Sequence, residues 1–335
     1  MTGSNYQPAR QEDRALLEAR HIKKYFSVRG DAIRHPSAIR AVDDVSFSIA
    51  KGTVLGLVGE SGCGKTTVGR IILNLIKPTE GSVFFDGEDI TGCGRRMMRE
   101  VRRRLQIVFQ DPFSSLDPHM TVYDIVGEGI RNYKLARGKA DLMRQVECLA
   151  VKCGLSEDLC SRYPHQFSGG QRQRICIARA LATNPEFIVC DEAVSALDVS
   201  IQAQIINLLK ELQEDMGLTY LFVSHDLRVV EFISDEVAVM YLGKILEKGS
   251  AEDVFRHPLH PYTEALLSAA PAFTEEEKSA KKRIILEGDM PSQTNSPSGC
   301  PFSTRCPYVE RECQTFAPEW GEVTPGHFAA CHRVK

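Results

Sequence analysis

Residues 59–66, GESGCGKT, have the composition and spacing of a phosphate-binding loop. In the pattern G-x-x-x-x-G-K-[ST], backbone N–H groups cradle phosphate oxygens, the lysine reaches the terminal phosphates and the hydroxyl ligates Mg2+. Lys65 and Thr66 would take these two roles. The apolar run TVLGLV before the loop and the periodic segment KTTVGRIILNLI after it predict a strand and a helix. This order is the context that a phosphate site needs and that a flexible surface loop lacks.

Two acidic residues end a second apolar run. FIVCD (187–191) is typical of a buried strand that ends at Asp191, and Glu192 follows. The first acid is placed to hold Mg2+ and the second to polarise an attacking water. An Asp-Glu pair that merely caps a strand is the alternative, but the phosphate loop upstream favours catalysis.

Gln110 and His225 come at or just after the ends of two further apolar runs, LQIVFQ (105–110) and TYLFVSHD (219–226). His225 could donate a hydrogen bond to a transferring phosphate, and Gln110 could reach water or Mg2+ as a sensor. Neither residue is diagnostic alone, and His225 in isolation would be interpreted as structural.

The stretch QFSGGQRQR (166–174) precedes RICIARALA, which has helical periodicity. Ser168 suits a helix N-cap, where its hydroxyl accepts a hydrogen bond from an orphan amide. Gly169 and Gly170 leave nothing between those amides and an approaching anion, and a helix N-terminus favours negative charge. We interpret this stretch as a second anion site.

The elements around these residues alternate between apolar strands and amphipathic helices such as IQAQIINLLKELQEDM (201–216). This alternation predicts an α/β fold with a mostly parallel sheet covered by helices. Residues 17–58 indicate short strands, and residues 120–165 indicate a mostly helical inserted lobe. Beyond Pro271 the charged and turn-rich segments FTEEEKSAKKR and PSQTNSPSG predict a linker or loosely packed connector.

The composition argues against several classes of protein. The 335 residues are 43% hydrophobic and 25% charged with a net charge of -3, which gives no hint of a nucleic-acid-binding surface. No apolar run approaches the roughly 20 residues that cross a bilayer, and the polar start is unlike a secretory signal. We therefore expect a cytosolic chain, in which the seven cysteines that are scattered singly pack as free thiols.

GESGCGKTT, Gln110, FSGGQ, FIVCDE, SALD (195–198) and His225, in this order, closely resemble the ATPases of ABC transporters. The resemblance implies the P-loop NTPase fold of that family, with a mostly parallel sheet, an antiparallel β subdomain and an inserted helical subdomain at about 111–175. It also implies that the signature serine and glycines face the γ-phosphate of ATP held by a second subunit, so that two ATP molecules are sandwiched in a dimer. The positions that the resemblance assigns to the nucleotide are Gly59, Glu60, Ser61, Gly62, Cys63, Gly64, Lys65, Thr66, Thr67, Ser168, Gly169, Gly170, Gln171 and Asp198.

The same family stacks adenine on an aromatic residue near the start of the chain. By register Phe26 matches that position, with Tyr25 as the fallback and plain core packing as the alternative. Two positions depart from the family pattern: Ala193 replaces a usual proline, and Thr66 replaces the more frequent serine. Both departures keep the required chemistry.

The chain also resembles, over nearly its whole length, the ATP-binding subunits of oligopeptide and dipeptide importers. HPLHPYTEALLSAAP (257–271) and GCPFSTRCP resemble their C-terminal extension, which divides the chain into residues 1–255 and 256–335. The insert between Tyr25 and Ala41 is similar to that of the second of their two ATPase subunits. RYPHQFSGGQ lacks the acidic-glycine segment of exporters, which favours import.

This resemblance implies a homologous ATPase as a heterodimer partner, two membrane-spanning permease subunits and an extracytoplasmic solute-binding protein. The chain would lie peripherally on the cytoplasmic face of the membrane and bind no nucleic acid. The lobe that follows Gln110-Asp111-Pro112 would accept short coupling helices. Import of nickel or another small solute is one alternative, and a soluble ABC ATPase acting on nucleic acid or ribosomes is a less favoured one.

Cys300, Cys306, Cys313 and Cys331 have the spacing C-x5-C-x6-C-x17-C, which matches neither a zinc ribbon nor a ferredoxin. Four thiols in a short tail of a cytosolic protein favour a metal over disulfides. The family resemblance implies a [4Fe-4S] cluster on these four residues, with Zn2+ or unligated thiols as alternatives. His327 and His332 are lower-ranked substitute ligands.

Overall fold

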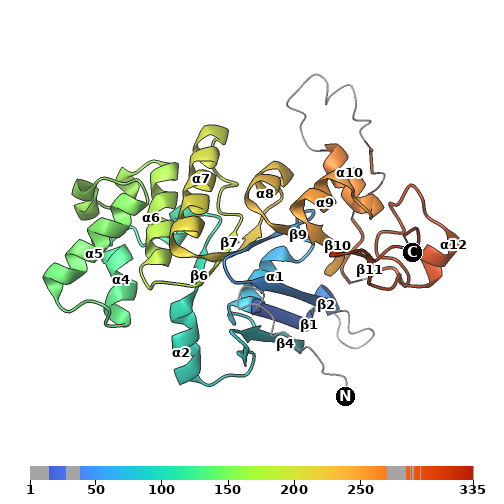
Figure 1. The fold of residues 1–335 in the computed structure, drawn as a ribbon, viewed down its shortest axis with the longest axis horizontal. Helices are drawn as coiled ribbons and strands as arrows, with labels where there is room; N and C mark the ends of the chain where they lie inside the picture. The colour runs from blue at the N-terminus through green and yellow to red at the C-terminus, as the bar shows by residue number, and fades with distance from the viewer. Residues whose placement is uncertain are drawn as a thin grey trace, which may run out of the picture.

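The computed structural model describes residues 15–27, 38–269, 284–286, 288, 290–294 and 296–334. The insert expected after Tyr25 and the charged segment FTEEEKSAKKR therefore lie largely or wholly outside the described residues. Figure 1 shows a central sheet with a helical lobe at one end of the long axis and a cysteine-bearing extension at the other. Among the described residues, no helix is long and apolar enough to span a bilayer.

The central sheet has eight strands in the order β11-β12-β10-β9-β3-β8-β7-β6. The five strands from β9 to β6 run parallel, and the other three are antiparallel additions at one side. Their bounds are β3 Val54–Val58, β6 Leu105–Val108, β7 Phe187–Asp191, β8 Thr219–Val223, β9 Glu236–Tyr241, β10 Lys244–Ser250, β11 Gly321–Thr324 and β12 His327–Ala329.

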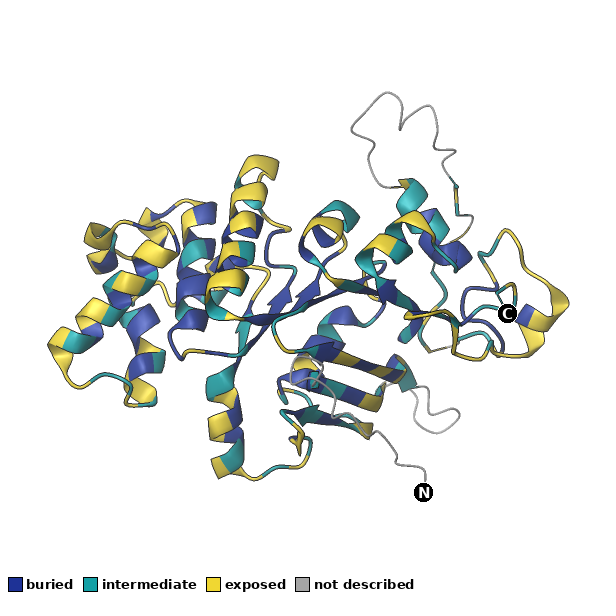
Figure 2. Cartoon of the chain, viewed as in Figure 1, coloured by how far each residue is buried: buried dark blue, intermediate teal, exposed yellow. Residues whose placement is uncertain are grey.

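The parallel strands are apolar throughout because both faces of the sheet are covered. In β3, Val54 and Val58 belong to one buried cluster, whereas Leu55 and Leu57 belong to the other. Successive side chains of a strand point to opposite faces, so one apolar run feeds two cores. Figure 2 shows these strands as the buried centre of the molecule, while the outer faces of the surrounding helices are exposed.

A second sheet, antiparallel in the order β2-β1-β4-β5, shares one of these cores with helix α1 (Lys65–Ile72). The region 17–58, expected to form short strands, contains most of two long strands, each of 13 residues. Register shifts between Ala19 and Lys24 interrupt the alternation of apolar residues, which explains why the sequence pattern indicated short strands. The bounds are β1 Ala15–Ser27, β2 Ala38–Ala50, β4 Glu80–Phe85 and β5 Glu88–Asp89, and helix α2, Arg95–Arg104, leads back to the central sheet.

The helical lobe packs against the other core. It holds α3 Pro112–Ser115, α4 Val122–Asn132, α5 Lys139–Lys152, two 3-10 turns, η2 Glu157–Ser161 and η3 Pro164–Gln166, and the start of α6 Gly169–Leu181. Three further helices, α7 Val199–Met216, α8 Leu227–Ile233 and α9 Ala251–Arg256, lie along the same side of the central sheet as the lobe (Figure 1).

The C-terminal extension is continuous with the central sheet. After α10 (Pro261–Ala269) and α12 (Arg311–Thr315), the hairpin β11-β12 pairs with β10 and extends that sheet. The predicted division at residue 255 falls inside α9. The extension is thus held by sheet hydrogen bonds as well as by side-chain packing.

Candidate functional site

The topology brings four of the predicted segments to one edge of the sheet. The P-loop follows β3, Gln110 lies two residues beyond β6, Asp191 ends β7, and His225 lies two residues beyond β8. These strands are mutually parallel, so their carboxyl ends meet at the same edge. Residues as far apart in sequence as Gly59 and His225 therefore lie around one site.

The P-loop wraps closely around the start of α1. Gly59 and Gly64 have φ of +150° and +112°. A Cβ at Gly59 would collide with the carbonyl oxygen of Met240, and one at Gly64 with that of Ala41. The amino group of Lys65 lies inside the loop, where it donates to the carbonyl oxygens of Gly59 (2.8 Å) and Glu60 (3.1 Å). Its side chain is buried, so a positive charge is concentrated where terminal phosphates would lie.

Thr66 and Asp191 meet beneath the loop. The Thr66 hydroxyl donates to the Asp191 carboxylate at 3.0 Å. Burial raises the pKa of the Asp191 carboxyl above its ordinary value, while the hydrogen bond from Thr66 opposes that shift. A hydroxyl and a buried carboxylate side by side are oxygen ligands of the kind that Mg2+ prefers, with the remaining ligands supplied by phosphates and water.

Glu192 lies at the centre of a second group. The Gln110 amide donates to the Glu192 carboxylate at 2.8 Å, and His225 Nδ1 lies 3.5 Å from the same oxygen. Glu192 has φ of +50°, a left-handed conformation that is unusual for a residue with a side chain. The structure therefore brings together the three residues predicted as catalytic. The Glu192 backbone is held in an unfavourable conformation that aims its carboxylate at Gln110 and His225.

The stretch QFSGGQRQR (166–174), called the signature below, begins helix α6 at Gly169, directly after Ser168, as the predicted N-cap implies. Ser168 is the N-cap: its hydroxyl accepts from Gln171 N–H (3.3 Å), and the Gln171 side chain accepts from Ser168 N–H (3.1 Å). A Cβ at Gly170 would collide with Ile201 of α7, so packing requires that glycine. A Cβ at Gly169 would lie 3.6 Å from a Leu197 methyl group, an ordinary contact distance, so the lack of a side chain there has no such structural cause.

Asp198 and Thr67 were also predicted to contact nucleotide. Asp198 is exposed at the N-terminus of α7, and its side chain makes no capping hydrogen bond. Thr67 is half-buried in the first turn of α1, and Ser61 and Gly62 are exposed on the P-loop. Their positions leave these residues available to a ligand.

Tyr25 and Phe26, the adenine candidates, differ in what they already contact. The Tyr25 hydroxyl donates to Asp43 at 2.6 Å, and burial together with that bond raises the pKa of Tyr25 to about 12. Phe26 is 39% exposed, with the Lys24 ammonium 5.1 Å from its ring centroid. Phe26 is therefore the ring that is free to stack on a base.

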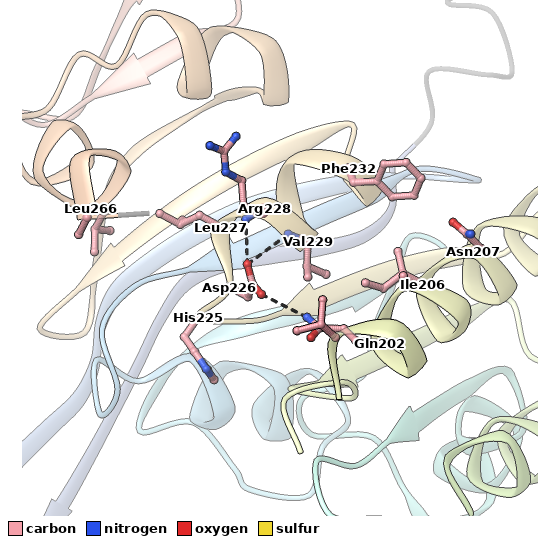
Figure 3. A pocket seen from close by; sticks show the side chains of 13 residues that line it. Gln202, Ile206, Asn207, His225, Asp226, Leu227, Arg228, Val229, Phe232 and Leu266 are labelled. Carbon is pink, nitrogen blue, oxygen red and sulfur yellow. Dashed lines mark hydrogen bonds between the residues drawn. The ribbon is translucent and has the colours of Figure 1, made fainter. Parts of the chain in front are cut away.

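A cavity of about 820 Å³ lies behind His225, between α7 and α8. Figure 3 shows His225 pointing away from the apolar lining at Phe232 and Ile206. The adjacent Asp226 carboxylate accepts from Arg228 N–H and Gln202, so it caps α8 and is not a spare catalytic acid. The cavity thus borders the phosphate edge at His225, while the rest of its lining comes mostly from α7, α8 and α10.

The four tail cysteines line one small cavity, together with His260 and His332. Burial raises the pKa of Cys300 to about 11, and the neighbouring thiols add to the shift. No group of three or more His, Cys, Asp or Glu in the described part of the chain is arranged to hold a metal ion. His327, named as a substitute ligand, is instead bonded to the buried Glu247 at 2.8 Å.

Contacts from the extension to the P-loop were missed by sequence reasoning. Arg305 pairs with Glu60, Tyr262 contacts the backbone of Glu60, and Gln293 contacts that of Gly62. The segment around Gln293 was expected to be a loosely packed connector, and that expectation is wrong at this residue. Partners separated by 202 to 245 positions leave no local pattern that could have revealed them.

Comparison with known proteins agrees with this geometry. Residues 42–195 match the ABC transporter family, and residues 246–313 match the family described as oligopeptide/dipeptide transporter, C-terminal region. The chain is 51% identical over 319 residues to the oligopeptide transport ATP-binding protein AppF of Bacillus subtilis, which covers 95% of this chain and 97% of AppF. It is 47% identical to OppF of Salmonella typhimurium, over 97% of this chain and 98% of OppF.

Among solved structures, the dimeric post-hydrolysis state of the ATP-binding cassette MJ0796 bound to ADP and Pi superposes with a TM-score of 0.62. That match has 30% sequence identity and covers 70% of this chain and 98% of the other. The expected fold, with a parallel core, an antiparallel subdomain and an inserted helical lobe, is confirmed. The chain belongs to the ABC-transporter ATPases, in the group of oligopeptide transport ATP-binding proteins.

Proposed function

We propose that this chain powers the import of oligopeptides or dipeptides by hydrolysing ATP. The observation that carries the proposal is the combination of a complete set of phosphate-site residues at one sheet edge with a C-terminal extension of the oligopeptide/dipeptide transporter type. The names of AppF and OppF, which align over nearly their full lengths, support peptides as the cargo.

At the site, we assign the P-loop amides (59–67) and Lys65 to the β- and γ-phosphates. Thr66 and Asp191 would hold Mg2+ directly, with Gln110 as a further ligand or sensor. The buried position of Asp191 and its contact with Thr66 support this assignment. The ion would neutralise charge that develops on the phosphates.

We assign Glu192 as the base that polarises the attacking water. His225 would donate to the γ-phosphate, and Gln110 would keep the Glu192 carboxylate oriented. The distances of 2.8 Å and 3.5 Å to one carboxylate oxygen support a group that acts together. Phe26 would stack on adenine, and Gln171 and Asp198 would lie beside the nucleotide of a partner ATPase.

We further propose that Ser168, Gly169 and Gly170 bind ATP held by a homologous ATPase, which makes the active form a heterodimer. Gly169 supports this, because no steric demand within the chain explains it. The pair would lie on the cytoplasmic face of the membrane beneath two permease subunits fed by a solute-binding protein. The 64% exposed ring of Phe113, at the start of the lobe, supports docking of a permease there.

Affinity purification from native membranes tests the transporter assignment. The tagged chain, extracted in mild detergent, is expected to bring down a second ATPase, two multispanning proteins and a solute-binding protein, identified by mass spectrometry. The reconstituted complex should then take up short peptides in an ATP-dependent manner. Recovery only with ribosomes or DNA-repair proteins would contradict the proposal, and uptake of nickel without peptides would change the cargo.

We also propose that Cys300, Cys306, Cys313 and Cys331 hold a [4Fe-4S] cluster. All four cysteines line one cavity, which supports a single metal centre shared by the four thiols. The cluster would supply folding energy to the end of the chain.

Iron content tests this assignment. Anaerobically purified protein is expected to contain iron with a broad absorbance near about 400 nm. Cys306→Ser should remove most of the iron and most of the absorbance. Cys148→Ser, at an exposed lone cysteine in α5, should keep both the iron and the absorbance. Purified protein that contains zinc and no iron, or neither metal, would contradict the cluster.

A further inference from the structure

Three side chains from the C-terminal region of the chain hold the P-loop from its outer side. Arg305 Nη1 donates to both carboxylate oxygens of Glu60, at 2.8 and 3.0 Å. The Tyr262 hydroxyl accepts from the Glu60 N–H at 2.9 Å. The Gln293 amide donates to the Gly62 carbonyl at 2.7 Å. These contacts hold Glu60 and Gly62, which occupy two of the variable positions of the motif G-x-x-x-x-G-K-[ST].

The Tyr262 contact starts from a rigidly packed aromatic cluster. Tyr262 packs against Tyr241 of β9 and Phe302, with ring centroids 4.6 and 5.3 Å apart, and all three rings are fully buried. Tyr241 ends the strand next to β3, whose end carries the P-loop. An aromatic cluster of this kind fixes ring positions tightly, because interiors are packed to crystal-like density. The hydroxyl of Tyr262 is therefore held in place before any ligand arrives.

The charged pair is also mostly shielded from water. The Arg305 side chain is 10% exposed and that of Glu60 is 26% exposed. A charge-assisted hydrogen bond in such surroundings is stronger than a surface ion pair, which is weakened by solvent and salt. Arg305 also compensates a carboxylate that would otherwise stand unpaired beside the site of a highly negative ligand.

Fixing these atoms fixes the loop amides that bind phosphate. A peptide unit is planar, so holding the Gly62 carbonyl sets the orientation of the Cys63 N–H in the same unit. Likewise, the bond from Glu60 N–H to Tyr262 sets the first peptide after Gly59. Phosphate binding depends on the direction of backbone N–H groups, so anchoring both peptides lowers the ordering cost of binding.

We propose that Arg305, Tyr262 and Gln293 are positioning residues that make ATP affinity depend on the C-terminal extension. The proposal rests on the assignment of the P-loop as the phosphate site. It gives the extension a function in nucleotide binding in addition to any role in the transporter's assembly. The coupling is reciprocal: ATP should stabilise the extension as much as the extension favours ATP.

The first test measures nucleotide affinity in the full-length chain. Arg305→Met is expected to weaken ATP binding roughly tenfold, as the loss of one charge-assisted contact would. Arg311→Met, at an exposed arginine of α12 without a P-loop contact, is the matched control and should bind normally. Tyr262→Phe and Gln293→Ala should each weaken binding less, with Gln314→Ala as the control for glutamine.

The affected step distinguishes positioning from general destabilisation. Arg305→Met should weaken the binding of ATP and of pyrophosphate but not that of adenosine. Its melting temperature should stay near that of the unsubstituted chain. Glu60→Gln combined with Arg305→Met should recover some of the affinity, because the unpaired carboxylate is gone. If Arg305→Met does not fold, the Tyr262→Phe and Gln293→Ala chains, which keep the ion pair, carry the same test.

Hydrogen exchange supplies the reciprocal measurement. In the Glu192→Gln background, ATP is expected to slow amide exchange over residues 296–334, and Arg305→Met should remove most of that protection. ATP binding unchanged in all three variants, with no protection of the extension, would overturn the proposal. Absence of ATP binding by the unsubstituted chain and by Arg311→Met would instead contradict the phosphate-site assignment itself.

Discussion

The Glu192 carboxylate contacts two residues from neighbouring strand ends, and its own backbone occupies a left-handed conformation. A single-residue kink directly after β7 explains how Asp191 and Glu192 reach different partners although they are adjacent. Asp191 continues the strand direction and meets Thr66, while Glu192 turns toward Gln110 and His225. Two adjacent carboxylates thus face different partners, which suits the proposed roles of Asp191 as a metal ligand and of Glu192 as a base.

The residue-scale prediction concerns the base. Glu192→Gln keeps the shape and the contact with Gln110 but removes the negative charge that polarises water. In the purified complex, ATP binding should stay within about twofold of the unsubstituted protein while the hydrolysis rate falls by roughly 10² to 10³. Phosphate release and nucleotide binding are the two measurements.

The control is Glu214→Gln, an exposed glutamate near the end of α7. It should hydrolyse ATP at the normal rate. Turnover of Glu192→Gln close to that of the control would refute the assignment of Glu192 as the base.

At this scale the sequence pattern singled out residues that the structure gathers at one sheet edge, and their roles stay predictions. The glycines of the P-loop, the lysine inside it and the acids after an apolar strand all follow from spacing and flanking pattern. It failed for Arg305 and Gln293, because their partners are set by tertiary packing over more than 200 residues. It also ranked His327 as a substitute ligand, whereas that histidine bonds Glu247 inside the sheet.

At the scale of elements, the long apolar runs were the most predictable. FIVCD forms β7 with the expected bounds, because a fully buried strand must be apolar on both faces. The ends of elements were less predictable: LQIVFQ forms a strand only to Val108, and α1 ends at Ile72, two residues before Asn74 adopts φ of +50°. Such ends depend on pairing and turns that hydrophobic periodicity does not encode.

One network of ion pairs joins the antiparallel sheet to the central sheet. Arg104, at the end of α2, donates to Glu186 before β7 (2.6 Å) and to Asp86 after β4 (2.8 Å). Lys51, after β2, also donates to Glu186 at 3.1 Å. The hydrogen bond from Arg104 lowers the pKa of the Glu186 carboxyl below its ordinary value of 4.5. The network therefore links the antiparallel subdomain to the parallel core.

The element-scale prediction is a pH-dependent loss of stability. Arg104→Met should lower the free energy of unfolding by about 1 kcal/mol at neutral pH, since the groups are partly exposed. A carboxyl with a lowered folded-state pKa stabilises the fold above 4.5, and this contribution is lost as the pH falls through the folded-state pKa. The difference between Arg104→Met and the unsubstituted chain should therefore shrink in acid.

Denaturant unfolding at neutral pH and at a pH below the folded-state pKa of Glu186, which itself lies below 4.5, measures this difference. Arg102→Met, at the exposed arginine two residues earlier, is the control and should change stability little at either pH. An equal loss at both values would contradict an electrostatic origin and indicate lost packing of Arg104 over the Phe85 ring, which lies 4.7 Å away.

The whole molecule is organised around the central eight-stranded sheet, and the proposed site lies at the carboxyl edge of its parallel strands. The helical lobe and the cysteine-bearing extension lie at opposite ends (Figure 1), and each reaches the centre by a different route. The lobe leads into α6, whose N-terminus carries the signature, while the extension joins β10 and contacts the P-loop. Within the described residues, no hydrogen bond or ion pair joins residues 166–171 to the P-loop.

The proposed two-subunit sandwich assigns the signature and the P-loop to different nucleotides, and the last prediction follows from that proposal. Ser168→Arg should leave ATP binding by the isolated chain unchanged, because Ser168 would contact only the partner's ATP. Lys65→Ala should abolish that binding, because Lys65 supplies the positive charge inside this chain's own loop. Both variants should lose ATP-dependent association with the partner ATPase.

Fluorescent-nucleotide titration measures binding by the isolated chain, and analytical ultracentrifugation with the partner measures association. Val151→Arg, an exposed position on α5, is the control for an added arginine and should behave normally in both. If Ser168→Arg weakened ATP binding by the isolated chain as much as Lys65→Ala does, the signature would act on the chain's own nucleotide. The two-subunit sandwich would then be contradicted, since a site completed within one chain needs no partner to close it.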